Sequence, residues 1–161
     1  AVVAVAASGR TPFTVAAAEA ARARGALTVG IAGVAGSALL AACDHGVLVE
    51  TGPEAVAGST RMKAGTAQRV ALTLLSTQVM VGLGRVHGGL MVAMRPQNAK
   101  LRERAAGIVA RLSGCGRAEA EAALAATGWA IRPAVLVARG IAPEEAERRL
   151  ASSGGRLRDL L

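Results

Sequence analysis

Aromatic residues are almost absent from this sequence, which contains one phenylalanine, one tryptophan and no tyrosine among 161 residues. The core must therefore be built from Ala, Val and Leu, with few rings to fill space. The same absence argues against a surface that stacks nucleic-acid bases on aromatic side chains, although the formal net charge is +8. The basic residues are also scattered, with no dense basic block. We therefore expect no nucleic-acid partner.

Cysteine and long apolar runs are also scarce. Cys43 and Cys115 lie far apart and lack the spacing of metal ligands, so we expect two reduced thiols and no metal site. No apolar run reaches membrane-spanning length without a glycine or a charge, and no basic segment precedes the apolar start as in a signal peptide. These patterns predict a cytoplasmic protein with no membrane segment, metal or cofactor.

Apolar strand patterns alternate with helical patterns in the first part of the chain. We expect strands at 1–6, 27–32 and 46–50, and helices at 12–24 and 36–42 between them. The alternation predicts an α/β fold with a partial, doubly wound parallel sheet of about three strands. The first strand is apolar throughout, which is typical of a strand buried on both faces. Two long helices, at 66–83 and 98–112, should follow.

The pattern becomes purely helical from Gly114 onward. Three short helices are expected at 117–126, 129–138 and 143–151, separated by glycines. We therefore predict two domains, residues 1–112 and a small helical appendage at 113–161. Trp129 is more simply the core anchor of this appendage than a ligand contact.

The most informative stretch is G-S-T-R-M-K-A-G-T-A-Q-R at residues 58–69. Hydroxyls, cations and flexible glycines gathered before a helix make a pocket for a phosphate or a phosphorylated small molecule. The spacing is not that of a Walker A loop. An ordinary capped helix start with solvated cations is the alternative interpretation. The candidate ligands are Ser59, Thr60, Arg61 and Lys63.

A second candidate loop follows the first strand. Ligands of open α/β sheets bind at the carboxyl ends of the strands, so this loop and the 58–63 loop should share one rim of the sheet. The alternative is that Ser8 is a simple turn residue and Thr11 a simple helix cap. The candidate ligands are Ser8, Gly9, Arg10 and Thr11.

Three strings together resemble the N-acetylmuramic acid 6-phosphate etherase family: A-A-S-G-R-T-P-F at 6–13, G-P-E-A-V-A-G-S-T-R-M-K-A-G-T-A-Q-R at 52–69 and G-G-L-M-V at 88–92. That family belongs to the sugar isomerase (SIS) fold group, and the glucokinase regulatory protein is a relative. The resemblance covers essentially the whole chain but only the C-terminal half of a family member. It implies that the helical tail resembles a ubiquitin-associated three-helix unit.

The resemblance implies a lyase that removes D-lactate from N-acetylmuramic acid 6-phosphate, with no metal and no cofactor. The acid and base glutamates of the family would precede residue 1, so this chain alone should be incomplete and inactive. Glu54 could contact a sugar hydroxyl, or could simply be an acid at a turn after Pro53. The resemblance also implies a phosphorylated amino sugar as ligand and a homodimer as the assembly.

The chain departs from the family at residues 87–93, His-Gly-Gly-Leu-Met-Val-Ala, where members often have Tyr-Gly-Asn-Leu-Met-Val-Asp. An amide and a carboxylate are lost there. His45 and His87 themselves suit packing or surface roles. Three other functions stay open: a non-catalytic phosphosugar-binding regulator, a ketose–aldose sugar phosphate isomerase, and a truncated inactive fragment.

Overall fold

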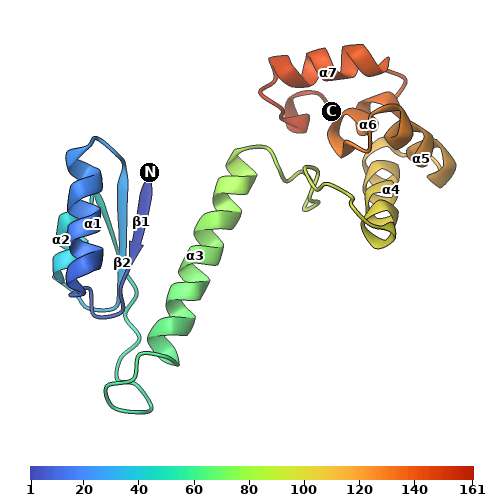
Figure 1. Cartoon of the computed structure of the whole chain (residues 1–161). Coiled ribbons are helices and arrows are strands. Elements are labelled where there is room, and N and C mark those ends of the chain that lie inside the picture. The colour runs from blue at the N-terminus through green and yellow to red at the C-terminus, as the bar shows by residue number, and fades with distance from the viewer. The chain divides into compact units, whose positions relative to one another are not determined.

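The computed structural model describes all residues, 1–161, and divides the chain into two compact units. The first unit contains Ala1–Ser76 and the second contains Thr77–Leu161. Figure 1 labels β1, β2 and the seven α-helices. Each unit is described by itself below.

The first unit is built on a parallel sheet of three strands, in the spatial order β1-β2-β3. The strands are β1 (Val2–Val5), β2 (Thr28–Ala32) and β3 (His45–Leu48). Val5 pairs with Ile31, which pairs with Val47. The α/β prediction and its three parallel strands are therefore confirmed, and β3 begins one residue earlier than predicted.

Two helices, α1 (Pro12–Ala23) and α2 (Ala38–Ala42), pack against the same face of this sheet (Figure 1). Gly30 and its pairing partner Gly46 lie on that face and allow the close approach of α2. A Cβ atom added to Gly30 would lie 2.9 Å from both the Cys43 sulfur and the Leu39 carbonyl oxygen. The small core between the layers consists of Ala4, Ala6, Ala18, Leu39 and Cys43.

The opposite face of the sheet is only partly covered. Val3 and Val47 lie on it, because side chains alternate along a strand, and they are 42% and 39% exposed. The expectation that the first strand is buried on both faces is therefore wrong for this chain. The physical reason is that both connecting helices lie on the other face.

The long helix α3 (Lys63–Gly82) follows the sheet, close to its predicted range of 66–83. Its sequence is apolar around most of its circumference, yet Ala64 is its only buried residue. Large exposed side chains run along it, including Val70, Leu74, Val79 and Met80. A helix of this kind is stable in water only when another surface covers it.

The second unit is helical and has its own core. Its helices are α4 (Ala99–Ser113), α5 (Arg117–Ala126), α6 (Ile131–Val137) and α7 (Pro143–Ser152), followed by the short 3₁₀ helix Leu157–Asp159. Helix α4 packs on α5 and α6, and Trp129 packs, partly buried, against this core. The domain boundary between residues 112 and 113 and the ubiquitin-associated character of the tail remain predictions.

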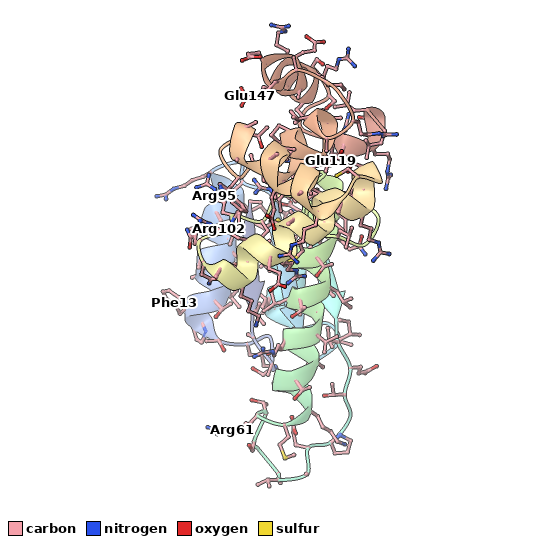
Figure 2. The ribbon with its side chains drawn as sticks, turned by 90° about the vertical axis from the view of Figure 1, so that its right-hand side faces the viewer. Phe13, Arg61, Arg95, Arg102, Glu119 and Glu147 are labelled. Carbon is pink, nitrogen blue, oxygen red and sulfur yellow. The ribbon has the colours of Figure 1, made fainter.

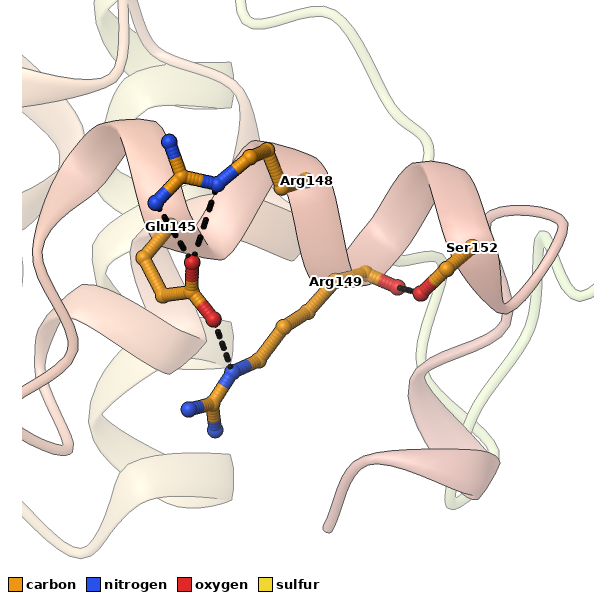
Figure 3. A network of polar contacts seen from close by, with 4 residues as sticks. All are labelled: Glu145, Arg148, Arg149 and Ser152. Carbon is orange, nitrogen blue, oxygen red and sulfur yellow. Dashed lines mark hydrogen bonds and ion pairs between the residues drawn. The ribbon is translucent and has the colours of Figure 1, made fainter.

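Helix α7 shows how the charges of this unit are balanced locally. Glu145 accepts hydrogen bonds from Arg148 at 2.7 Å and from Arg149 at 2.8 Å (Figure 3). These bonds, first from Arg149 and then from Arg148, lower the pKa of the Glu145 carboxyl. No helix in the structure is both long enough and apolar enough to cross a membrane.

Candidate functional site

The loops that follow the three strands begin at one edge of the sheet. The Gly33 N–H donates to the Ala7 carbonyl at 2.9 Å, and the Val49 N–H donates to the Ala32 carbonyl at 2.8 Å. These bonds extend the parallel pairing beyond the strands and hold the starts of the three loops beside one another. The first predicted loop and the segment that leads from β3 to the second predicted loop thus both begin at the carboxyl edge of the sheet, which is where open α/β sheets bind ligands.

The loop from Ser8 to Thr11 is packed tightly onto the start of α2. Gly9 has a φ of +64°, and a Cβ atom added to it would clash with the side chain of Ser37. The Gly9 carbonyl accepts a hydrogen bond from the Leu39 N–H at 2.9 Å. Ser8 stabilises the turn by accepting a weaker bond from the Arg10 N–H at 3.3 Å. Only glycine therefore fits at position 9.

The first turn of α1 presents unpaired backbone donors. Thr11 is the N-cap residue, but its side chain makes no capping hydrogen bond, and Pro12 has no N–H. The N–H groups of Phe13 and Thr14 have no acceptor in the structure. Phe13 itself is 83% exposed and projects outward (Figure 2). The positive end of a twelve-residue helix is therefore open to an anion.

Ser37 lies beside the first predicted loop and was not among the candidate residues of the sequence analysis. It is 4% exposed, and its hydroxyl oxygen is buried without a hydrogen-bond partner. The hydroxyl lies against Gly9, inside the first predicted loop. A serine before a short helix looks like an ordinary cap in the sequence, and only the structure shows that the hydroxyl caps nothing.

The second predicted loop is fastened by Glu54. The Glu54 carboxylate accepts hydrogen bonds from the Lys63 N–H at 3.0 Å and from the Ala64 N–H at 2.9 Å. The Lys63 ammonium donates to the Pro53 carbonyl at 2.7 Å. The two backbone bonds, Ala64 first, lower the pKa of the Glu54 carboxyl. Glu54 and Lys63 thus contact the protein's own backbone, whereas the sequence analysis placed both among ligand-binding residues.

Ser59, Thr60 and Arg61 are free to meet a ligand. Their backbone is fixed, since the Ser59 N–H donates to the Val56 carbonyl at 3.0 Å and the Gly65 N–H donates to the Thr60 carbonyl at 2.9 Å. Their side chains make no hydrogen bond or ion pair in the structure. Figure 2 shows Arg61 projecting outward from the loop.

The carboxylates near the rim do not form a catalytic pair. Of the two acids that follow β3, Glu54 is engaged by backbone donors, and Glu50 is exposed and makes no hydrogen bond. No cluster of three or more His, Cys, Asp or Glu side chains could hold a metal ion. Two clefts, of about 630 and 420 Å³, lie within the second unit, and neither is lined by a residue of the two loops. His87 lines the smaller cleft, and His45 is exposed on β3.

Known proteins resemble this chain over nearly all of its length. Residues 1–78 match the SIS domain family. The N-acetylmuramic acid 6-phosphate etherase of Deinococcus radiodurans is 48% identical over 99% of the chain and 52% of its own length. The etherase of Streptomyces avermitilis is 51% identical over 99% of the chain and 52% of its own length, and that of Rubrobacter xylanophilus is 50% identical over 97% and 52%. The chain spans about half the length of the curated relatives it matches.

Proposed function

We propose that this chain supplies part of the phosphosugar site of an N-acetylmuramic acid 6-phosphate etherase, because residues 1–78 match the SIS domain family and nearly the whole chain aligns with about half of such enzymes. The observation that carries this proposal is the sequence identity of 48% and 51% to two of these etherases over 99% of the chain. The aligned region includes the loops whose free donors suit an anionic sugar. The expected ligand is a hexosamine 6-phosphate.

The two loops divide the ligand-binding groups between them. The open first turn of α1, with Ser8, Gly9, Arg10 and Thr11, offers N–H groups, hydroxyls and a cation for the phosphate. Ser59, Thr60 and Arg61 offer free side chains from the second loop. The unpartnered hydroxyl of Ser37 supports the assignment, because buried polar groups rarely stay without a hydrogen bond unless a ligand or water completes them.

The proposed reaction of the complete enzyme is removal of the D-lactyl ether. Opening of the sugar ring gives an aldehyde and makes the proton on C2 acidic. A base takes that proton, an acid protonates the departing lactyl oxygen on C3, and water then adds to the unsaturated aldehyde. These steps need two positioned acid–base groups. The Glu54 carboxylate is bonded to two backbone N–H groups, and Glu50 has no carboxylate partner beside it. We therefore propose that the acid and the base lie in the other half of the enzyme.

The proposed assembly is a cytoplasmic homodimer. The exposed apolar side chains of α3 and the partly covered face of the sheet support a partner surface. The intact protein would then act in the recycling of cell-wall amino sugars.

A binding experiment tests the assignment of the loops. In the intact enzyme, Ser59→Ala combined with Thr60→Ala should weaken the binding of N-acetylglucosamine 6-phosphate by about 0.5–1.5 kcal/mol for each lost hydrogen bond to the sugar. Thr73→Ala with Ser76→Ala removes two exposed hydroxyls from the body of α3 and serves as the matched control. Isothermal titration calorimetry gives both affinities. Unchanged affinity in the loop variant would remove that loop from the site.

An activity assay tests the chemistry. The purified chain should release no D-lactate from N-acetylmuramic acid 6-phosphate in an assay coupled to D-lactate dehydrogenase. Release of D-lactate by the chain alone would show that it does contain an acid–base pair. If that activity then disappeared in Glu54→Gln, Glu54 would be the catalytic residue.

A non-catalytic phosphosugar-binding regulator is the second candidate. The specific observation in its favour is that backbone N–H groups hold the Glu54 carboxylate. The candidate ligand-binding groups therefore have no free pair of carboxylates beside them. Under this alternative the intact protein would bind the phosphosugar but release no D-lactate.

A further inference from the structure

Glu54 occupies the place that an anionic ligand would take at the start of α3. Its two carboxylate oxygens accept the N–H groups of Lys63 and Ala64, the first two residues of a twenty-residue helix. The first turn of α3 contains no acidic residue of its own. The negative charge that stabilises this helix end is therefore supplied by a residue nine positions before Lys63.

This contact closes the intervening loop into a fixed shape. The Lys63 ammonium is bonded to the Pro53 carbonyl, so the two ends of the loop are joined by three hydrogen bonds. Gly58 allows the turn between them with a φ of +80°. The loop leaves Ser59 and Thr60 with free hydroxyls. Glu54 thus links the start of α3 to the loop that carries Ser59 and Thr60.

The contact also decides which helix start can take a phosphate. A phosphate at the start of α3 would have to displace a carboxylate that two N–H groups already hold, and the two anions would repel each other. The start of α1 has no such occupant, because the N–H groups of Phe13 and Thr14 are unpaired. The two loops are consequently not equivalent anion sites, although their sequences look alike.

We propose that Glu54 is a positioning residue, an internal substitute for a ligand anion, which fixes the 59–61 loop for contact with the sugar and leaves the phosphate to the start of α1. The role of Glu54 is argued from its contacts alone, whereas the division of the ligand between the loops rests on the proposed function. Glu54 acts through the loop and touches no reacting atom.

Amide NMR on the full chain tests this proposal. Inorganic phosphate should shift the Phe13 and Thr14 amide signals of the unsubstituted protein and leave those of Lys63 and Ala64 unchanged. In Glu54→Ala, hydrogen exchange at Lys63 and Ala64 should become at least tenfold faster. Acetate or phosphate should then shift these two signals and slow their exchange again, since a free anion takes the vacant place. Glu54→Gln, which keeps one acceptor oxygen, should give an intermediate exchange rate.

The controls separate the role of Glu54 from a general effect on folding or function. Glu50→Gln removes an unengaged acid from the same segment and should change neither exchange nor phosphate shifts. Unchanged Thr28 and Asp44 signals show that the sheet has folded in each variant. Unchanged exchange in Glu54→Ala, or phosphate shifts at Lys63 and Ala64 in the unsubstituted protein, would overturn the positioning role. If exchange responds as expected but N-acetylglucosamine 6-phosphate shifts none of the four amides, the proposed function fails and the role of Glu54 as the internal anion of α3 stands.

Discussion

Thr28 and Asp44 hold the starts of two neighbouring strands together through three hydrogen bonds. One carboxylate oxygen of Asp44 accepts from the Thr28 N–H at 2.9 Å and from the Thr28 hydroxyl at 2.8 Å. The Asp44 N–H donates in turn to the Thr28 hydroxyl oxygen at 2.9 Å. Arg22, in the last turn of α1, adds an ion pair to the other carboxylate oxygen at 2.9 Å. The pair thereby ties β2, β3 and α1 together at the edge opposite the candidate site.

Replacing Thr28 by valine should destabilise the sheet unit. Thr28 is completely buried, so valine keeps its shape but leaves the Asp44 N–H without its acceptor. The expected loss is about 1–3 kcal/mol in the free energy of unfolding. Urea denaturation followed by circular dichroism measures it. Thr73→Val, at an exposed position on α3, is the control, and equal stability of the two variants would contradict the structural role of the Thr28 hydroxyl.

Acid should weaken the same connection. The Thr28 N–H and then the Thr28 hydroxyl, with a further contribution from Arg22, lower the pKa of the Asp44 carboxyl. A carboxyl whose pKa is lower in the folded protein contributes its full stability above its ordinary pKa, and that stability is lost as the pH falls through the lowered value. The difference in unfolding free energy between the unsubstituted protein and Asp44→Asn should therefore be largest near neutral pH and shrink in strong acid. A difference that is constant with pH would be contrary to this account, and Glu19→Gln, at an exposed acid of α1, is the control.

Gly9 and Gly36 provide a matched pair for testing the first loop. Their φ angles are +64° and +65°, but only at Gly9 would an added Cβ atom meet another residue, the side chain of Ser37. Gly36→Ala should cost only the backbone strain of about 1–2 kcal/mol. Gly9→Ala should cost more and should also weaken phosphosugar binding at least tenfold, because the loop must move away from Ser37. Thermal unfolding and calorimetric titration of both variants check this, and equal effects would show that the close packing of Gly9 is unimportant.

The exposed apolar side of α3 should make the chain associate. Val70 and Leu74 are 53% and 59% exposed on a helix whose large apolar side chains need a partner surface. Size exclusion coupled to light scattering should show a dimer or soluble aggregates, and Val70→Gln with Leu74→Gln should shift the population toward monomer. A monodisperse monomer with a sharp two-state melt in the unsubstituted chain would exclude this role for α3.

The sequence alone determined most of the secondary structure. Alternation of apolar runs with helical patterns predicted all three strands, and Pro12 and Pro143 marked the starts of α1 and α7 correctly. It also showed the resemblance to N-acetylmuramic acid 6-phosphate etherases in the 6–13, 52–69 and 88–92 strings, and etherases about 50% identical to the chain align with nearly all of it. These features can be predicted from the sequence because strand and helix periodicity, proline geometry and motif spacing depend on residues that are neighbours in the chain.

Only the tertiary structure decided which contacts Glu54 and Ser37 make in the candidate site. Glu54 lies nine residues before Lys63, and Ser37 lies twenty-eight residues after Gly9, so neither contact follows from local pattern. A carboxylate beside a cationic loop looks like a ligand contact in the sequence, and a serine before a helix looks like a cap. In the structure Glu54 accepts hydrogen bonds from the start of α3, and the Ser37 hydroxyl has no partner. Hydrogen bonding between residues far apart in the sequence depends on how the fold packs their segments together.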